Sequence, residues 1–408
     1  MPSPFPLFEA LEPRRLLSVS YTPAQIQAAY GFNQITFDNG TIQGNGAGQT
    51  IALIEVDDDQ TLNTDLANFD TKFNLPAPGP SWSLTVVGQN GVSLPSNPTT
   101  VDENAETALD VEWAHAIAPA ANILVVEANS DFDSDLNPAL YEAQSFKNVS
   151  VVSMSYTREE LSSDIFSNGN YTTPDMHQGI TYVAASGDSG TISHPASSPY
   201  VVGVGGTSLT IGPNNTYGSE TAWAGSGGGY STVQPEPDYQ ETAQNSGQRA
   251  SPDVSYDADI NTGFQFYFDG SSTLFRAGGT SAGAPQWAAL FAIADQGRAL
   301  NGLDTLDGAT ETLPMLYALY DTSLYNSAFH DITSGGNAGY SASTGYDPVT
   351  GLGSPQANVL VQYLAGNISI PEPATFTIAL AAIPLLLRPA RSASRIAPRA
   401  KSASADTE

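Results

Sequence analysis

Two acidic residues have the types and the spacing needed for proton transfer. Glu106 and Asp110 lie four residues apart in a predicted helix that has Asp102 as its N-cap and stops at Pro119. This spacing places both carboxyl groups on one face of the helix. A buried pair would share a proton, so it could accept a proton from a hydroxyl group and return it at acidic pH, where histidine is already charged. A solvated helix face is the alternative interpretation.

A serine and a third acid occur in glycine-containing turns. Ser281 ends the run Gly278-Gly279-Thr280-Ser281 and precedes a predicted helix. The glycines permit close backbone approach, and a serine at a helix start gains from the N–H groups and the helix dipole. Ser281 is therefore a candidate nucleophile, with an ordinary helix cap as the alternative. Asp188 is a further candidate, for which a simple turn residue is the alternative.

A second group of acids lies near the C-terminus. Asp331 and Asp347 are separated by a glycine-rich loop within the segment 331–353. Two carboxylates and neighbouring backbone carbonyls can form an all-oxygen calcium site. Two turns capped by aspartate would give the same pattern, so both interpretations stay open at this point.

The elements that must position these residues are apolar strands alternating with helices. The chain has 408 residues, 40% of them apolar, which is enough for a substantial core. Apolar runs at 51–56, 123–127, 149–155 and 181–185 alternate with helical segments, which predicts an α/β fold with a parallel sheet covered on both faces. Functional groups are then expected at the carboxyl ends of these strands.

The charge of the chain excludes one class of partner. The formal net charge is -29, and the stretch 19–370 holds 37 acidic residues but only six basic ones. Nucleic acid is therefore not an expected partner. Protonation of carboxylates near pH ~4 would relieve the self-repulsion, which favours an acidic working environment, with solubility as the alternative reason for the acidity. The absence of cysteine excludes disulfides and thiol catalysis.

Several ordered motifs together resemble those of the sedolisin family, the serine-carboxyl peptidases related to the subtilisins. The resemblance extends from about Tyr21 to about Pro355 and implies a subtilisin-like α/β fold, mostly parallel, with helices on both faces. It rests on these motifs: Tyr21-Thr22-Pro23-Ala24-Gln25; Glu106 and Asp110 followed by Ala116-Ile117-Ala118-Pro119; Ser186-Gly187-Asp188-Ser189-Gly190; Ser226-Gly227-Gly228-Gly229-Tyr230-Ser231; Ser251-Pro252-Asp253-Val254-Ser255; and Gly279-Thr280-Ser281.

The resemblance implies catalytic roles for four residues. Ser281 would attack the peptide carbonyl, Glu106 would take and return its proton, and Asp110 would orient Glu106. Asp188 would complete the oxyanion hole, and it must be protonated to do so because a carboxylate cannot stabilise an oxyanion. The implied enzyme is a serine-type endopeptidase that hydrolyses proteins or peptides at acidic pH.

The family also implies an outer hydrogen-bonded network and one structural calcium ion. Glu55 and Tyr156 match the outer network, although the family has tryptophan where Tyr156 stands, and Glu55 could equally be a strand-end acid. The implied calcium ligands are the side chains of Asp331 and Asp347 and the backbone oxygens of Ile332, Ser343 and Gly345. Ser343 replaces a common glycine, a change that a main-chain ligand can survive.

The two ends of the chain resemble export signals. We expect a targeting or processing segment at 1–20, a peptidase domain at 21–366, and a sorting tail at 367–408. Residues 8–18 resemble an N-terminal motif of exported planctomycete-type proteins, and the tail resembles a PEP-CTERM signal. The apolar stretch 374–387 would span only ~21 Å as a helix, less than the ~30 Å bilayer core. These features predict an extracellular or envelope-associated protein that meets envelope-sorting machinery.

Two rival functions and one departure from the family stay open. A histidine-dependent subtilisin would need one of His115, His177, His194 and His330, but none has a His-Gly-Thr context. A non-catalytic, calcium-stabilised surface module for adhesion or peptide binding is the rival from another class. Sedolisins usually begin with a long pro-segment, so we expect unaided folding, a separate folding partner, or an incomplete sequence. A monomer is expected.

Overall fold

The structure is a computed structural model that describes residues 8–10, 19–76, 82–92 and 101–370. Its contacts divide the chain into Met1–Pro371 and Glu372–Glu408. Most of the predicted sorting tail, 367–408, and most of the predicted targeting segment, 1–20, lie outside the residues that the structure describes. Within the described part, no helix is both long enough and apolar enough to cross a bilayer.

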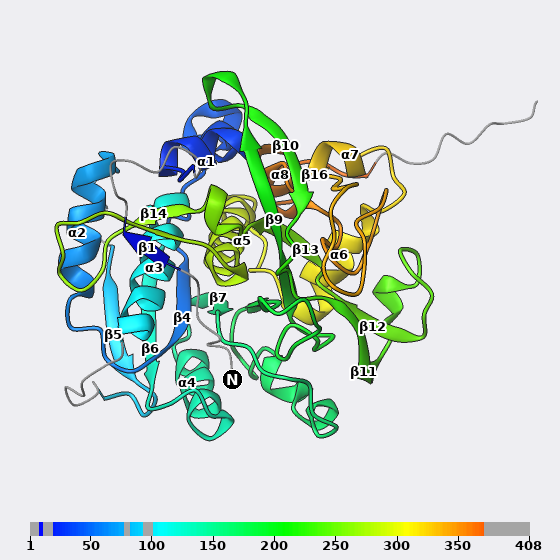
Figure 1. The fold of residues 1–408 in the computed structure, drawn as a ribbon, viewed down its shortest axis with the longest axis horizontal. Coiled ribbons are helices and arrows are strands. Elements are labelled where there is room, and N and C mark those ends of the chain that lie inside the picture. The colour runs from blue at the N-terminus through cyan, green and yellow to red at the C-terminus, as the bar shows by residue number, and fades with distance from the viewer. Residues whose placement is uncertain (1–7, 11–18, 77–81, 93–100, 371–408) are drawn as a thin grey trace, which may run out of the picture. The chain divides into compact units, whose positions relative to one another are not determined.

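A mostly parallel sheet forms the centre of the first unit (Figure 1). Its strand order is β10-β9-β8-β7-β4-β6-β5, and β13 also pairs with β9. All pairings are parallel except that of β10 with β9. The strands are β4 (Thr50–Val56), β5 (Leu84–Gly88), β6 (Asn122–Ala128), β7 (Val149–Met154), β8 (Thr181–Ala185), β9 (Val202–Ile211), β10 (Tyr217–Ala222) and β13 (Val254–Asp257).

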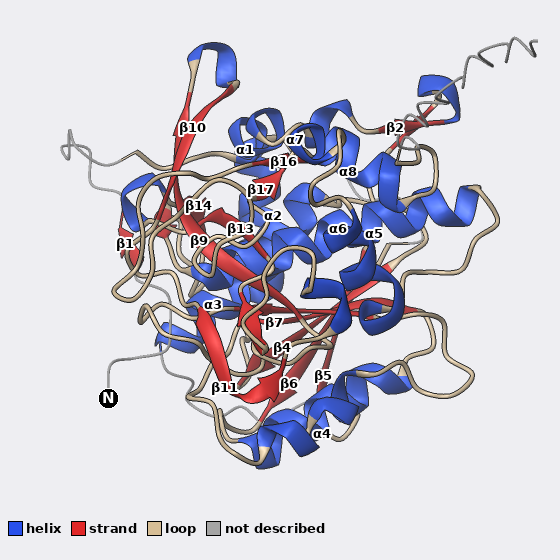
Figure 2. Cartoon of the chain, turned by 90° about the vertical axis from the view of Figure 1, so that its right-hand side faces the viewer, coloured by secondary structure: helices blue, strands red, loops and turns tan. Residues whose placement is uncertain are grey.

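Helices cover both faces of this sheet (Figure 2). In β4, Ile51 and Leu53 join the core under α3 (Val101–Ile117) and α5 (Gly283–Leu300), whereas the alternate residues face α4 (Asp133–Ser145). Both faces are apolar because the sheet has no solvent side. The four predicted strands all form, and the predicted α/β class with a mostly parallel, subtilisin-like sheet is confirmed.

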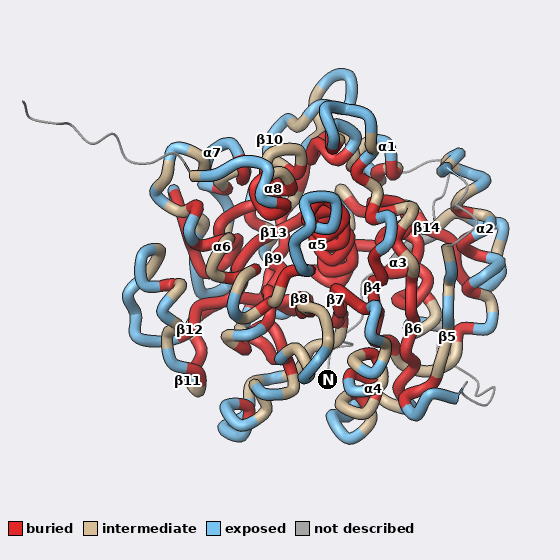
Figure 3. Tube along the Cα trace, turned by 180° about the vertical axis from the view of Figure 1, so that it is seen from behind, coloured by how far each residue is buried: buried red, intermediate tan, exposed pale blue. Residues whose placement is uncertain are grey.

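The helix that follows Ser281 is buried along most of its length (Figure 3). In α5, every residue from Gly283 to Arg298 is buried. A helix that is apolar on all sides belongs in the middle of a large core rather than at its surface. Its N-terminal end is thereby held rigidly, which fixes the position of the serine just before it.

The outer elements complete the fold. Residues Phe8–Ala10, within the predicted targeting segment, form β1, whose backbone pairs antiparallel with β15. The remaining helices and strands are α1 (Pro23–Ala29), β2 (Thr36–Phe37), β3 (Ile42–Gln43), α2 (Leu62–Phe73), β11 (Gly229–Pro235), β12 (Gln248–Ser251), β14 (Phe264–Phe266), β15 (Phe275–Ala277), α6 (Leu313–Ala318), α7 (Tyr325–Ala328), β16 (Phe329–His330), β17 (Ser354–Pro355) and α8 (Ala357–Leu364).

Two helices begin in different ways. Thr22 is the N-cap of α1, with Pro23 in the first turn, and its backbone N–H donates to Gln25 Oε1 at 3.0 Å. The helix α3 instead begins at Val101. Asp102 therefore lies inside the first turn of α3, where its charge still favours the positive end of the helix dipole.

Candidate active site

The candidate nucleophile lies in a short turn between β15 and α5. Gly279 has φ +126°, an angle that residues other than glycine rarely adopt. A Cβ on Gly278 would lie 2.5 Å from the backbone nitrogen of Ile260. These two glycines let the chain turn sharply into a 3-10 helix, Thr280–Ala282. Ser281 is only 4% exposed, and its Oγ has no hydrogen-bond partner among the described residues. The hydroxyl is thus held in place and left without a competing partner.

Glu106 and Asp110 are one turn apart on α3, and both are buried. Burial raises the pKa of Glu106 well above its usual value, the negative charge of Asp110 raises it further, and the hydroxyl groups of Ser281 and Ser155 oppose the rise. Neither carboxyl oxygen of Glu106 forms a hydrogen bond of standard geometry in the described part of the chain. Ser281 is therefore close enough to affect Glu106 electrostatically, at a looser separation that is common in ligand-free active sites.

Ser155 links the acid pair to the nucleophile, a role that the sequence analysis did not predict. Its Oγ donates to Asp110 Oδ2 at 2.5 Å and lies 3.4 Å from the main-chain oxygen of Ser281. Ser155 follows β7 directly, at the carboxyl end of the sheet. A position after a central parallel strand is the only hint that the sequence offers, and many serines share it.

Glu55 extends the row of carboxyl groups. Burial raises its pKa well above the usual value, the negative charge of Glu106 adds to the rise, and a hydrogen bond with Asp110 opposes it. Burial likewise raises the pKa of Asp110, and the negative charge of Glu55 raises it further. Three buried carboxyls so close together cannot all be ionised, so protons are shared along the row Glu106, Asp110 and Glu55.

Tyr156 departs from the outer network that the family resemblance implies. Burial raises the pKa of its hydroxyl, and the charged groups that affect it are Asp133 and Arg158 rather than Glu55. Its ring packs with the apolar cluster that includes Tyr171 and Leu136. Within the described residues, Tyr156 therefore forms part of a cavity wall and no hydrogen bond to the carboxyl row.

Asp188 lies on the other side of the nucleophile. Its Oδ1 accepts hydrogen bonds from the Thr280 backbone N–H at 2.8 Å and the Thr280 hydroxyl at 2.9 Å. The residue is open to solvent on one side, yet desolvation by the site raises the pKa of its carboxyl, while the two bonds from Thr280 lower it. Because both bonds end on Oδ1, Oδ2 stays available to carry a proton.

The two halves of the predicted calcium site come together. Both carboxyl oxygens of Asp331 accept from the backbone N–H of Gly345, at 3.0 and 3.1 Å. Asp347 Oδ2 accepts from Ser343 N at 3.1 Å, so the backbone of residues 343–345 contacts both acids. Gly345 has φ +79°, which explains the glycine. Oxygen donors of this kind suit Ca²⁺, and Ile332 follows Asp331 directly, so the residues present fit the ion.

A cavity of about 850 Å³ opens beside the acid pair. Glu106, Ser155 and Glu55 line one side of it, and apolar side chains such as Leu136 and Tyr156 line another. Its rim carries the acids Asp131, Asp133, Glu103 and Glu159, together with Arg158. Arg158 is already bonded to Asp133 at 2.9 Å and to Asp164 at 2.8 Å, so its charge is compensated within the protein.

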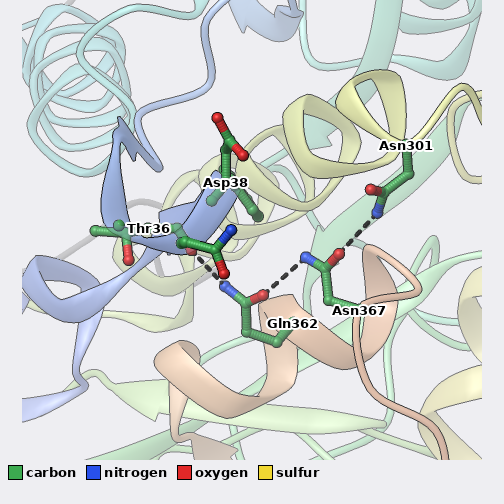
Figure 4. A pocket seen from close by; sticks show the side chains of 8 residues that line it. Thr36, Asp38, Asn301, Gln362 and Asn367 are labelled. Atoms are coloured by element: carbon green, nitrogen blue, oxygen red, sulfur yellow. Dashed lines mark hydrogen bonds between the residues drawn. The ribbon is translucent and has the colours of Figure 1, made fainter.

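A second cavity, of about 660 Å³, lies at the opposite end of α5 (Figure 4). Gln362 donates to the Thr36 carbonyl, Asn367 donates to Gln362, and Asn301 donates to Asn367, at 2.7 to 3.0 Å. Only Asp38 among its lining residues is titratable. The eighteen residues of α5 separate this cavity from Ser281 by about 27 Å along the helix, so the two sites are distinct.

The four histidines have partners elsewhere. His115 lies 3.4 Å from Asp70, His177 bonds to the Gln178 and Phe146 carbonyls, His194 bonds to Tyr171, and His330 stacks on Tyr217. None forms a hydrogen bond with the candidate catalytic residues in the described structure. The described structure therefore offers no histidine partner for Ser281.

The chain is similar in sequence to a known protein family and to several characterised relatives. A family model for the subtilase family matches residues 99–346. The chain belongs to the subtilase family. Among relatives of this subtilase, kumamolisin from Bacillus sp. (strain MN-32) is 33% identical over 395 residues, which cover 87% of this chain and 65% of kumamolisin. Sedolisin from Pseudomonas sp. (strain 101) is 32% identical over 220 residues, 47% of this chain and 36% of that protein.

A solved structure agrees with these matches. Pseudomonas sedolisin, described as a serine-carboxyl proteinase in complex with pseudo-iodotyrostatin, superposes with a TM-score of 0.73 at 25% identity, covering 86% of this chain and 99% of that one. The resemblance to sedolisins is thereby confirmed. The subtilase chain spans less than two thirds of the length of the curated relatives named here.

Proposed function

We propose that this subtilase is an acid-acting serine-carboxyl peptidase, an endopeptidase in which Ser281 is the nucleophile. The observation that carries the proposal is the Ser281 hydroxyl: it has no hydrogen-bond partner of standard geometry in the described structure, it affects the pKa of the buried Glu106, and it follows Thr280, to which Asp188 is bonded. The relationship to sedolisin and kumamolisin supports the same reaction class. Acid action fits because carboxyl groups replace histidine as the proton acceptor.

The first step is attack of the Ser281 Oγ on the peptide carbonyl carbon. As the new C–O bond forms, the hydroxyl proton passes to Glu106, and the electron pair of the carbonyl π bond moves to its oxygen. Glu106 can take this proton only if the carboxyl row holds a negative charge. Asp110, fixed by Ser155 at 2.5 Å, keeps Glu106 oriented and stabilises the shared proton.

Asp188 stabilises the oxyanion that results. Its Oδ1 stays bonded to Thr280, and a proton on Oδ2 donates to the negative oxygen. The raised pKa of Asp188 keeps this proton in place to a higher pH than an ordinary aspartate would. Ionisation of Asp188 at higher pH removes the donor, so activity should fall as pH rises.

The intermediate then collapses to release the first product. The C–N bond breaks, Glu106 returns its proton to the leaving amine, and an ester remains on Ser281. Water repeats the sequence in the second half: Glu106 takes a proton from the water, and the ester oxygen leaves as the Ser281 hydroxyl with that proton. Each half therefore ends with the borrowed proton given up and Glu106 again able to accept one.

The cavity beside Glu106 would hold a substrate side chain. Its apolar wall and acidic rim suit a peptide side chain with an apolar stem, and such a contact would fix the peptide relative to Ser281. Calcium, bound by Asp331, Asp347 and the carbonyls of Ile332, Ser343 and Gly345, would hold the C-terminal loop against the core and take no part in the reaction. Export to the cell surface, with processing by sorting machinery, is part of the proposal and rests on the terminal motifs.

Purified protein assayed on denatured protein between pH ~3 and ~7 tests the function. We expect cleavage that is strongest in the acidic part of this range and absent in Ser281→Ala, with products from the interior of the substrate seen by mass spectrometry. Products of three residues released only from the N-terminus would instead identify a tripeptidyl-peptidase. Undiminished cleavage by Ser281→Ala would refute the nucleophile.

A further inference from the structure

A fourth carboxyl group lies next to the catalytic row but has no role in the reaction described above. Glu127 is in β6, directly opposite Glu55 in the parallel register of β4 and β6. Residues that face each other across neighbouring strands point to the same side of the sheet, about 4.8 Å apart. Both strands therefore end an apolar row with an acid on the side that faces α3, after Leu53 in β4 and Val125 in β6.

The environment of Glu127 disfavours a charge. The residue is 1% exposed, and neither carboxyl oxygen forms a hydrogen bond of standard geometry within the described residues. An ionised carboxylate without partners is costly to bury. Burial raises the pKa of Glu127 to about 8, with the charges of Asp58, Asp59 and Asp57 adding to the rise and the Asp59 backbone N–H opposing it.

The loop after β4 ties this group to the site. The Asp57 backbone N–H donates to the Ala128 carbonyl at 2.9 Å, and Asp57 has φ +61°, an uncommon conformation for aspartate. Burial and a hydrogen-bonded contact with Glu103 raise the pKa of Asp57 to about 7, and burial raises that of Asp59 to about 6. The groups that face this loop from neighbouring elements are Glu103 on α3, Asp65 on α2 and Asp131 after β6.

We propose that Glu127 is a positioning residue that extends the carboxyl row beyond Glu55 and, in its neutral form, keeps Glu55 and Asp110 in the arrangement that Glu106 needs. Ionisation of Glu127 places a negative charge beside Glu55, which disturbs proton sharing along the row. The negative charge of Glu127 already contributes to the raised pKa of Glu55. This inference rests on the proposed peptidase function for its effect on turnover, but not for the coupling itself.

The test compares Glu127→Gln with wild type and with a matched control, Asp295→Asn. Asp295 is equally buried, has one unpartnered oxygen and lies on α5, where its charged neighbours are Arg298 and Glu311. Because ionisation of Asp188 also lowers activity as pH rises, the kcat profiles are compared in an Asp188→Asn background. When Glu127→Gln is added there, we expect kcat near pH 4 to stay within about threefold of the parent and the alkaline limb to move up by about half a pH unit or more. Asp295→Asn should leave the limb in place.

A second readout separates this proposal from the peptidase function. ¹³C NMR of labelled glutamate carboxyls, assigned with Glu55→Gln, follows the titration of Glu55 whether or not the protein turns over any substrate. The midpoint of Glu55 should fall in Glu127→Gln and stay in Asp295→Asn. An unchanged midpoint overturns the coupling, and a lowered midpoint with an unmoved kcat limb overturns the positioning role. Absence of cleavage at every pH in wild type would refute the peptidase function and leave the NMR result to decide the coupling.

Discussion

The acids around Ser281 and the acids of the C-terminal loop use the same functional group in opposite ways. In the loop, both oxygens of Asp347 are occupied, Oδ1 by the backbone N–H groups of Val349 and Thr350 and Oδ2 by Ser343 and the Thr350 hydroxyl. In the site, neither oxygen of Glu106 forms a hydrogen bond of standard geometry with any residue that the structure describes. The N–H donors around Asp347 hold its carboxyl group in place and oppose the rise in pKa that burial causes, whereas a buried carboxyl group without such donors exchanges a proton more readily.

This contrast indicates which feature distinguishes catalytic carboxyl groups from the other carboxyl groups of an acidic protein. The chain has 42 acidic residues, and charge alone does not identify the catalytic ones among them. Unpartnered oxygens near a nucleophile do distinguish them, because burial without hydrogen bonds is costly unless a function requires it.

The largest effect should come from Glu106→Gln. An amide cannot accept the Ser281 proton, so kcat should fall by about 10³ to 10⁴-fold, or roughly 4 to 5 kcal/mol in the activation barrier. Steady-state kinetics on a peptide substrate near pH 4 measures it. Glu112→Gln is the control, since Glu112 is a buried acid on the same helix that accepts from the Tyr267 backbone. Equal losses in both variants would mean that burial, not proton transfer, explains Glu106.

Asp188 should matter as a proton donor, and two variants separate this role from packing. Asp188→Ala removes the donor, so we expect a loss of about 10² to 10³-fold in kcat. Asp188→Asn keeps an acceptor for Thr280 and adds an N–H donor that does not ionise, so it should retain more activity and lose less of it as pH rises. A profile for Asp188→Asn that falls at the same pH as wild type would contradict the role.

Asp347→Ala tests the structural half of the contrast. It leaves four donors without an acceptor and removes a predicted calcium ligand, so the free energy of unfolding should fall by about 3 kcal/mol. Thermal unfolding with calcium and with a chelator measures both effects: wild type should lose stability on chelation, and the variant should no longer respond. The exposed Asp175→Ala is the control. A calcium response that survives in Asp347→Ala would exclude Asp347 as a ligand.

Ser155→Ala should have the smallest effect. Loss of the hydrogen bond to Asp110 should reduce kcat about tenfold, or ~1.4 kcal/mol, with little change in KM. Ser153→Ala provides the comparison, because Ser153 lies two residues earlier and its buried hydroxyl has no partner in the described structure. If the two variants had indistinguishable kinetics, the hydrogen bond from Ser155 to Asp110 would have no role in catalysis.

The sequence allowed prediction of the fold and of the residues that lie together in the candidate site, but not of the contacts among those residues. Apolar runs and alternating helices were sufficient for the four central strands, because burial on both faces leaves a strong pattern. Ordered motifs placed Glu106, Asp110, Asp188 and Ser281 in one site. Their catalytic roles stay predictions until variants are measured.

What the sequence could not reveal depends on contacts between distant segments. Ser155 and Glu127 stand at strand ends like many other residues, and only the register with β4 brings them to the carboxyl row. Tyr156 matched a position in the outer network, yet its ring packs in a cavity wall. No local sequence pattern predicts that the ring of Tyr156 packs in this wall.

The structure of the protein with a peptide aldehyde at about pH 4 tests the central claim most directly. The Ser281 Oγ should add to the aldehyde carbon as its proton passes to Glu106 and the electron pair of the carbonyl π bond moves to the oxygen. That oxygen should lie ~2.7 to 3.1 Å from Asp188 Oδ2, as an oxyanion-hole donor requires. An aldehyde that bonds elsewhere, or whose oxygen points away from Asp188, would contradict the account.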